Sequence, residues 1–247
     1  MKQSTVMAAG AFVSVWTASL FVAPAPATAA SVLAAAPSAY NWNGCYIGGS
    51  AGGLWAAKKW GAFSLFGGSE NGPGGDVTAS GGLYGGQVGC NMQIGAWVFG
   101  GQLDEAWSNA KGSNVEDLGL YSLPISDRAQ VTSLGSATVR VGYGFDRFLP
   151  FIKGGLAWDT SRFQEVAQFI NSSVVDDSRI GWTIGAGVEY AITHNLTVFA
   201  EYDFYDFGSK TENFVYVGVP PYDHSRSIRE TNNVVKVGLN WKFDFGP

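Results

Sequence analysis

The sequence predicts an all-β fold, an eight-stranded antiparallel up-and-down transmembrane β-barrel with four long external loops and short periplasmic turns. The clearest observation is in the last segment, where apolar residues stand at every second position from Val235 to Phe243, with Lys236, Asn240 and Lys242 between them. A period of two is typical of a strand with one apolar and one polar face. The same alternation recurs along the chain, and the connections are short and long in turn. This combination is typical of barrels that cross a bacterial outer membrane.

The first residues, 1–29, are a predicted Sec signal peptide. Lys2 supplies a positive charge, residues 7–23 are apolar, and Ala27-Thr28-Ala29 supplies the small residues of a cleavage site. A single helical anchor is the alternative, and Pro24 directly after the apolar stretch disfavours it. We therefore exclude this segment from the fold.

The rest of the chain is predicted to form a short N-terminal periplasmic segment at 30–43 and one outer-membrane β-barrel domain at 44–247. Removal of Lys2 with the signal leaves 14 basic against 20 acidic residues, a net charge of −6. This acidity argues against nucleic acid as a partner, because phosphate binding requires a basic face. Aromatic residues make up 14% of the chain, which excludes a disordered protein.

The eight expected strands follow one another with a regular rhythm of connections. Those after the second, fourth and sixth strands are brief, and those after the other strands are long, which is typical of periplasmic turns and external loops. With an even number of strands, both termini are then expected on the periplasmic side. The predicted strands are 44–57, 81–93, 96–108, 129–143, 150–163, 178–191, 196–207 and 232–245.

Aromatic side chains on the predicted apolar faces gather near the strand ends. The separation of Trp182 from Tyr190 corresponds to ~26 Å along a strand and to ~20 Å of height at a tilt near 40°, close to the apolar band of an outer-membrane barrel. A secreted soluble barrel such as a lipocalin would instead turn its apolar face inward. We predict a periplasmic girdle of Trp97, Tyr143, Tyr190, Trp241 and Phe243, and an external girdle of Trp55, Tyr84, Trp107, Trp158, Trp182 and Tyr202.

Four stretches resemble the small outer-membrane barrels of alpha-proteobacteria that are described as outer membrane immunogenic or porin-family surface proteins. They are 40–49 (YNWNGCYIGG), 85–93 (GGQVGCNMQ), 97–101 (WVFGG) and 235–243 (VKVGLNWKF). The resemblance covers most of the chain after the signal and implies a barrel similar to the membrane domain of outer membrane protein A. Where the family usually ends on an aromatic residue, this chain continues with Gly246-Pro247. No periplasmic peptidoglycan-binding domain is expected after the last strand.

Cys45 and Cys90 are the only cysteines, and they stand where the family tends to carry aromatic residues. Both are predicted to face outward near the periplasmic ends of adjacent strands. The envelope outside the inner membrane is oxidising, so the pair is a candidate cross-strand disulfide. Two thiols facing lipid are the alternative. A metal site is not expected, because two cysteines without a nearby histidine are too few ligands.

Charged residues on the predicted polar faces should point into the barrel. Eight strands leave an interior just wide enough for side chains, so mixed charges there are expected to pair and fill it. An ion path through the same charges is the alternative. The predicted lumen charge network consists of Asp104, Arg140, Lys153, Asp159, Arg179, Glu189, Glu201, Asp203, Lys236 and Lys242.

Specific recognition is expected in the two longest loops. The loop at 57–80 carries Lys58, Lys59 and Trp60, and the loop at 208–231 carries Phe214, Tyr216 and Arg226. Exposed aromatic residues with arginines can mark a binding surface. The alternative is that these residues continue the strands above the membrane.

The sequence predicts no enzyme and no cofactor. A catalytic rim would need a histidine with a serine or an acid beside it; His194 lies in a predicted turn, and Asp223-His224 has no evident further partner. We expect an integral outer-membrane structural and surface protein that contributes to envelope integrity and surface interaction. A narrow solute or ion channel and a surface receptor or adhesin are the alternatives. The expected partners are outer-membrane lipid, lipopolysaccharide and, during insertion, the barrel-assembly machinery.

Overall fold

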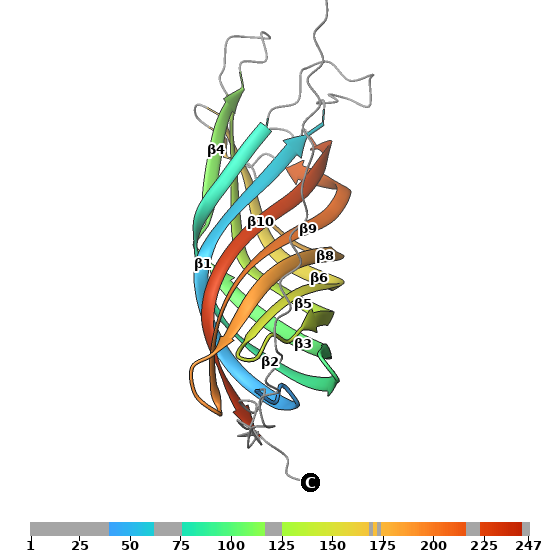
Figure 1. The fold of residues 1–247 in the computed structure, drawn as a ribbon. Coiled ribbons are helices and arrows are strands. Elements are labelled where there is room, and N and C mark those ends of the chain that lie inside the picture. Colours follow the sequence, from blue (N-terminus) through green and yellow to red (C-terminus); the bar gives the residue numbers. More distant parts are fainter. Residues whose placement is uncertain are drawn as a thin grey trace, which may run out of the picture. The chain divides into compact units, whose positions relative to one another are not determined.

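Antiparallel strands closed into a ring make up the fold (Figure 1). The computed structural model describes residues 40–61, 76–116, 125–167, 170–171, 174–215 and 223–243. Within these residues no helix has the length and apolar character needed to cross a membrane. The predictions for 1–29, for loop residue Tyr216 and for Gly246-Pro247 lie outside the described residues.

Eight strands cross the barrel, which confirms the predicted fold class. The ring closes where β10, red in Figure 1, pairs with β1, blue. Short β4 (Lys111–Glu116) continues β3 after a break at Asn109-Ala110, and β7 (Ile170–Asn171) adds two residues beside β6. The crossing strands are β1 (Gly44–Trp60), β2 (Asp76–Ile94), β3 (Trp97–Ser108), β5 (Ile125–Tyr143), β6 (Phe148–Ala167), β8 (Val175–Ala191), β9 (Leu196–Val215) and β10 (Asp223–Phe243).

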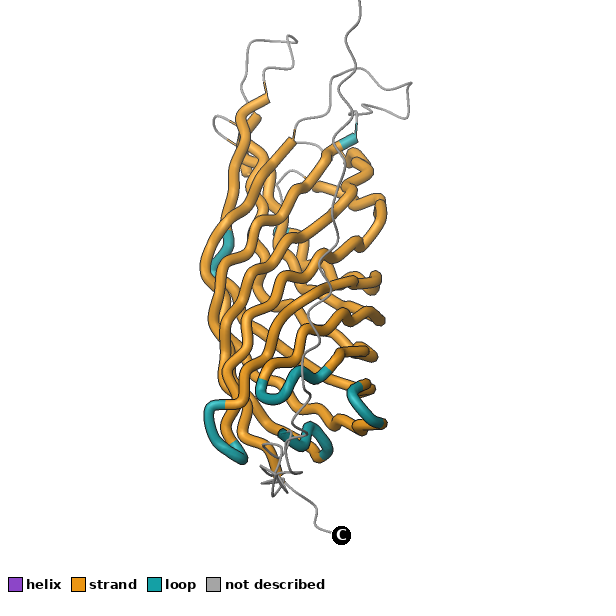
Figure 2. Tube along the Cα trace, in the orientation of Figure 1, coloured by secondary structure: helices purple, strands orange, loops and turns teal. Residues whose placement is uncertain are grey.

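Three brief connections lie at one end of the barrel, which we call the turn end; the opposite end is the loop end. Figure 2 shows these connections as short teal segments. They are Gly95-Ala96 between β2 and β3, residues 144–147 between β5 and β6, and residues 192–195 between β8 and β9. Gly95 has a φ of 63°, a left-handed conformation that glycine adopts without a steric penalty. The turn therefore begins one residue later than the predicted Ile94-Gly95.

At the loop end the strands are longer than the sequence predicts. Lys58 pairs with Glu230 and Lys59 with Arg229 in an unbroken β1–β10 ladder, so these residues continue the strands, which is the alternative to a loop that the sequence left open. The segment predicted as a loop at 208–231 is largely β9 and β10. The prediction ended the strands too early because the outward residues at the loop end are polar. Beyond the apolar band, a strand lacks the apolar outer face by which a membrane strand is recognised in the sequence.

The outward face of β10 shows where this change occurs. Its side chains are Val235, Val237 and further apolar residues toward the turn end, but Arg229, Thr231 and Asn233 toward the loop end. The inward face does not shift, since alternate residues stay buried along the whole strand. The apolar stretch from Val235 to Phe243 is ~26 Å long and ~20 Å high at a 40° tilt. Such a band matches the hydrocarbon region crossed by outer-membrane barrels.

Candidate functional site

The interior of the barrel holds every charged side chain that the sequence placed there. All of them are 7% exposed or less, and they are distributed over several levels between the two ends of the barrel. Because an isolated buried charge is costly, the partners of each charge decide what the interior can do. The buried residues from the predicted network are Asp104, Arg140, Lys153, Asp159, Arg179, Glu189, Glu201, Asp203, Lys236 and Lys242.

The central level joins two lysines to three carboxylates. Lys153 Nζ lies 2.9 Å from Glu201 Oε1 and 3.1 Å from Asp203 Oδ2. Lys236 Nζ lies 2.9 Å from the same Glu201 oxygen and 3.4 Å from the same Asp203 oxygen. Asp104 completes the group at 3.5 Å from Lys236 and 3.9 Å from Lys153. Each ammonium bridges strands that are not neighbours, so the cluster ties opposite walls of the barrel together.

A second level nearer the turn end is built around Arg140 and Glu189. Arg140 Nη2 lies 2.6 Å from Glu189 Oε2, and its Nη1 donates to the Tyr46 hydroxyl at 3.2 Å. The other Glu189 oxygen accepts hydrogen bonds from Thr197 Oγ1 at 2.6 Å and Asn240 Nδ2 at 2.9 Å. Both oxygens of the Glu189 carboxylate are therefore paired, and such additional hydrogen bonds help to offset the cost of burying an ion pair.

Residues 40–43, which precede β1, cover the turn end of the barrel. Tyr40 donates its hydroxyl to the His194 carbonyl at 3.0 Å, and Trp42 Nε1 donates to the Asp146 carbonyl at 3.3 Å. Lys242 Nζ lies 4.8 Å from the centre of the Tyr40 ring. Residues 40–43, the end of the N-terminal segment predicted at 30–43, thus pack against the barrel. The apolar cluster here comprises Tyr40, Trp42, Val98, Leu149 and Ala191.

An apolar level separates the central charges from those at the loop end. It includes Leu54 and Val234, which face each other across the β1–β10 pair, together with Tyr205 and Phe207. These side chains are at most 6% exposed. An ion moving along the interior would have to shed its water to pass this level, and that is costly. The remaining members are Ala56, Ala79, Leu83, Ala106, Ala110, Val131, Leu134 and Ala157.

Lys58 and Glu230 form the core of the charged level above it. Their side chains are fully buried and form an ion pair. Lys58 Nζ also donates to Ser161 Oγ at 3.0 Å, and Ser161 donates to Asp159 at 2.8 Å. Arg179 Nε lies 4.0 Å from the second Glu230 oxygen, so positive and negative groups alternate across the barrel.

Asp177 links this level to the water-exposed rim. It forms ion pairs with buried Arg179 and with Lys210, whose side chain is 49% exposed. Burial alone would raise the pKa of Asp177, but the hydrogen bonds and charges of Lys210 and Arg179 outweigh burial and lower the pKa below its usual value. The hydrogen bond to Asp177 raises the pKa of Lys210. Both groups therefore stay charged over a wider pH range than free side chains.

Aromatic side chains form the last level, at the loop end. The Trp60 ring centre lies 5.9 Å from that of Phe163 and 5.6 Å from that of Phe214. The Arg226 guanidinium lies 5.0 Å from the Trp60 ring and 3.3 Å from Asp127 Oδ2. Phe214 and Arg226 were predicted either as exposed loop residues or as part of extended strands; the structure places both in strands and buries them inside the barrel.

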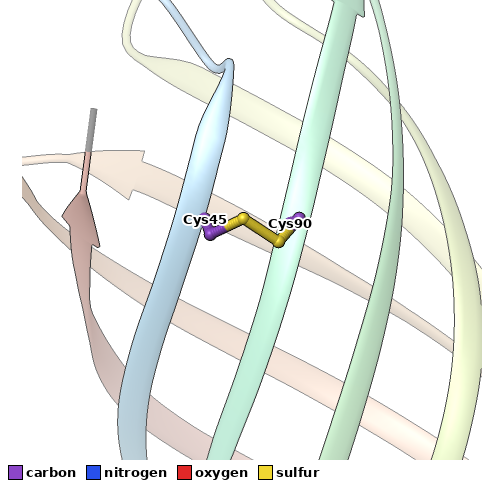
Figure 3. The surroundings of a disulfide bond; sticks show 2 residues. All are labelled: Cys45 and Cys90. Atoms are coloured by element: carbon purple, nitrogen blue, oxygen red, sulfur yellow. A yellow bond between two sulfur atoms is a disulfide. The ribbon is translucent and has the colours of Figure 1, made fainter. Parts of the chain in front are cut away.

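Cys45 and Cys90 form a disulfide on the outer wall (Figure 3). The two residues stand directly opposite each other in the β1–β2 ladder, with Cα atoms 3.9 Å apart. The bridge joins the turn-end portions of the two strands, because Cys45 is the second residue of β1. It therefore fastens the start of the barrel beside the packed segment at 40–43.

The aromatic residues predicted as girdles lie on the outer surface. Trp158 is half-buried, because its Nε1 donates to Glu105 Oε2 at 2.8 Å on the same outer wall. The others are between 37% and 66% exposed, which suits rings that lie at a membrane interface. They are Trp55, Tyr84, Trp97, Trp107, Tyr143, Trp182, Tyr190, Tyr202, Trp241 and Phe243.

Sequence reasoning missed the charges that lie in the predicted loops. Lys58, Glu230 and Arg226 are as buried as the predicted network, and one available signal could have found two of them. Glu230 and Arg226 continue the even-numbered, inward-facing series of Lys236 along β10. Among the described residues, no group of three or more histidine, cysteine, aspartate or glutamate side chains could hold a metal ion. The side chains of Asp223 and His224 are not among those described.

Comparisons with known proteins agree with this architecture. The family described as outer membrane protein beta-barrel domain matches residues 22–243. The 31 kDa outer-membrane immunogenic protein of Brucella melitensis is 34% identical over 88% of this chain and 93% of that protein. The 22 kDa outer membrane protein of Rhizobium leguminosarum bv. viciae is 29% identical over 82% of this chain and 79% of that protein.

Among solved structures, the outer membrane protein OprG from Pseudomonas aeruginosa has the same fold. It superposes with a TM-score of 0.55 at 16% sequence identity, covering 81% of this chain and 96% of that chain. At this identity the likeness concerns the fold alone. The family match over residues 22–243 and the 34% identity to the Brucella protein show that this chain belongs to the outer membrane protein β-barrel family of Gram-negative bacteria.

Proposed function

We propose that this protein is a non-catalytic structural and surface protein of the outer membrane, with a lumen closed to solutes. The observation that carries the proposal is the stack of filled levels inside the barrel. Aromatic residues lie at both ends, and paired charges and an apolar level lie between them. A filled interior of this kind fits a rigid structural protein better than a channel.

The proposal includes an orientation, with the loop end at the cell surface and the turn end in the periplasm. It is supported by the short connections at the turn end, since outer-membrane barrels keep short turns on the periplasmic side. The non-catalytic role is supported by the relatives, which are described as outer-membrane and immunogenic proteins. A receptor role would depend on connections at the loop end that lie outside the described residues.

Planar-bilayer recording tests the closed lumen. The refolded protein should produce no discrete openings at any applied voltage, after a shift in mobility between unheated and boiled gel samples has shown that it is folded. Discrete openings would favour the channel if Lys153→Met, in the central cluster, changed their ion selectivity. Ile152→Ala is the matched control, because Ile152 is the neighbouring residue and faces outward with 64% exposure. Openings that respond to Lys153→Met alone would overturn the proposal.

The orientation has a separate test. An epitope tag inserted at 216–222, between β9 and β10, should bind antibody on intact cells. The same tag inserted at 192–195, in the turn between β8 and β9, should bind antibody only after the outer membrane is permeabilised. The reverse pattern would show that the barrel is inserted the other way up.

A further inference from the structure

A groove of about 500 Å³ lies on the outer wall at the loop end, over β4, β5 and β6. Three basic side chains line it, Lys111 from β4, Arg128 from β5 and Arg162 from β6, and all three are exposed. Ser113, Gln130 and Gln164 add polar side chains between them. The groove therefore concentrates positive charge on a protein whose formal net charge is −5.

The strand register places the three cations around one point. Lys111 stands opposite Gln130, and Gln130 stands opposite Arg162, so these three residues form a row across neighbouring strands. Arg128 lies on the same face of β5, two residues from Gln130. Adjacent strands are ~4.8 Å apart, so the two ends of the row are separated by ~10 Å, a span that two long side chains can close around one anion.

Two of these cations have no acidic partner among the residues that the structure describes. Arg162 Nε lies 2.6 Å from Asp176 Oδ1, in a pair whose side chains are more than half exposed. Among the described residues, no carboxylate lies within ion-pair distance of Lys111 or Arg128. Unpaired cations gathered in one groove favour binding of an anion from outside the protein.

The position of the groove indicates where that anion comes from. Lys111 and Arg162 each stand four residues beyond an outward tryptophan, Trp107 on the β3 side and Trp158 on β6. Four residues correspond to ~13 Å along a strand, or ~10 Å of height at a 40° tilt. If the aromatic girdle marks the edge of the hydrocarbon, the groove lies at the level of lipid headgroups.

We propose that Lys111, Arg128 and Arg162 bind the phosphate groups of a phosphorylated glycolipid in the leaflet around the loop end. Charge complementarity, the open outward face and the depth relative to the girdle all favour this occupant. The source of the phosphate is a lipid, because the groove opens sideways toward the membrane rather than along the barrel axis. In the orientation proposed above, the lipid is lipopolysaccharide of the outer leaflet, so the inference rests on that orientation for the identity of its ligand.

Binding of purified lipid A tests the proposal. The full-length protein without its signal, refolded in maltoside micelles, is titrated with diphosphorylated lipid A and with chemically dephosphorylated lipid A, and binding is followed by native mass spectrometry. The double variant Lys111→Gln/Arg128→Gln should weaken binding of diphosphorylated lipid A by about tenfold to thirtyfold, since a basic residue near a membrane surface contributes ~1 kcal/mol. Binding of the dephosphorylated lipid should not change.

The matched control is Lys59→Gln/Arg229→Gln, which removes the same charge from outward residues of the β1–β10 pair. It should leave lipid A binding within about twofold. Equal losses in both double variants would show a diffuse charge effect and overturn the site, as would equal binding of the two lipids by the unmodified protein. Binding in micelles does not depend on how the barrel is oriented in a membrane. A negative result would therefore not affect the closed lumen or the orientation, which have their own tests.

Discussion

Lys58 of β1 and Glu230 of β10 stand opposite each other at the seam of the barrel, and both side chains are completely buried. The seam joins the first and last strands of the ring, so no short connection holds it together. Backbone hydrogen bonds and this ion pair close the barrel where the chain itself does not. Ser161 and Asp159 on β6, across the lumen, extend the pair to the opposite wall.

Removing one member of this pair should destabilise the barrel strongly. Lys58→Met leaves Glu230 buried beside fewer positive charges, and breaking a buried pair typically costs ~3–5 kcal/mol. Urea unfolding of the refolded protein in lipid vesicles measures the change in the free energy of unfolding. Lys59→Met, at the next residue but on the outer surface, should change it by less than ~0.5 kcal/mol. Equal stability of Lys58→Met and Lys59→Met would contradict the closing role.

The Cys45–Cys90 bridge should contribute to stability through the unfolded chain. The two residues are separated by 45 positions, and the chain-entropy relation gives ~4 kcal/mol for a loop of this length, with measured values often nearer 2–4 kcal/mol. Unfolding midpoints with and without a reductant measure the effect. The variant Cys45→Ser/Cys90→Ser serves as the control and should not respond to the reductant. If the reductant does not lower the unfolding midpoint of the native protein, the bridge does not stabilise the protein by restricting its unfolded chain.

Trp42 should anchor the N-terminal segment against the turn end. It is 1% exposed, and Trp42→Ala should lower the free energy of unfolding by ~3 kcal/mol or more, the usual cost of a large buried aromatic side chain. Trp97→Ala is the comparison, because Trp97 is 52% exposed on the outer wall. In detergent micelles the loss at Trp42 should exceed that at Trp97, and the opposite order would place the segment away from the barrel.

The Asp177–Lys210 pair should make the loop end sensitive to acid. The pKa of Asp177 is lowered in the folded protein, so its contribution is present above its unfolded pKa of ~3.9 and is lost as pH falls through the folded value. Lys210 is half exposed, so solvent screening limits the pair to less than ~1 kcal/mol. The stability advantage of the native protein over Lys210→Met should stay level from pH 5 to 8 and shrink below about pH 4.

Thermal unfolding at each pH measures that difference. Lys111→Met is the control, since no carboxylate of the described residues pairs with Lys111 and its effect should not depend on pH in this range. If the stability difference between the native protein and Lys210→Met grows as the pH falls, the lowered pKa assigned to Asp177 is contradicted.

The membrane-facing part of the fold could be predicted from residue alternation alone. Lys236 and Glu201 are polar residues between apolar neighbours, and a period of two assigns such residues to the interior of a barrel. Lys236 and Glu201 stand opposite each other on neighbouring strands, but their partners on distant strands could not be predicted from alternation, since which strands face each other across the lumen depends on the closed ring. Pairing of Lys153 with Glu201 across the lumen is a property of the ring and not of either strand.

The loop end escaped prediction because its alternation is reversed. Ile228 points inward and Arg229 outward, whereas Val235 points outward and Lys236 inward, although all four belong to one strand. Water outside the apolar band favours polar outer residues and an apolar core, as in a soluble barrel. A strand that passes from hydrocarbon into water does not keep one hydrophobic pattern along its length. For this reason the sequence predicts a loop where β9 and β10 extend beyond the apolar band.

Site-directed spin labelling tests the central claim, that the outer wall of β10 passes from hydrocarbon into water. Nitroxides are placed at Val237 and Ser227 in separate variants, Val237→Cys and Ser227→Cys, which face the same way on the strand and differ in height. In vesicles, the nitroxide at Val237 should collide readily with oxygen and rarely with a water-soluble nickel complex, and the one at Ser227 should show the reverse. A nitroxide at Val237 that the nickel complex reaches freely would contradict the account.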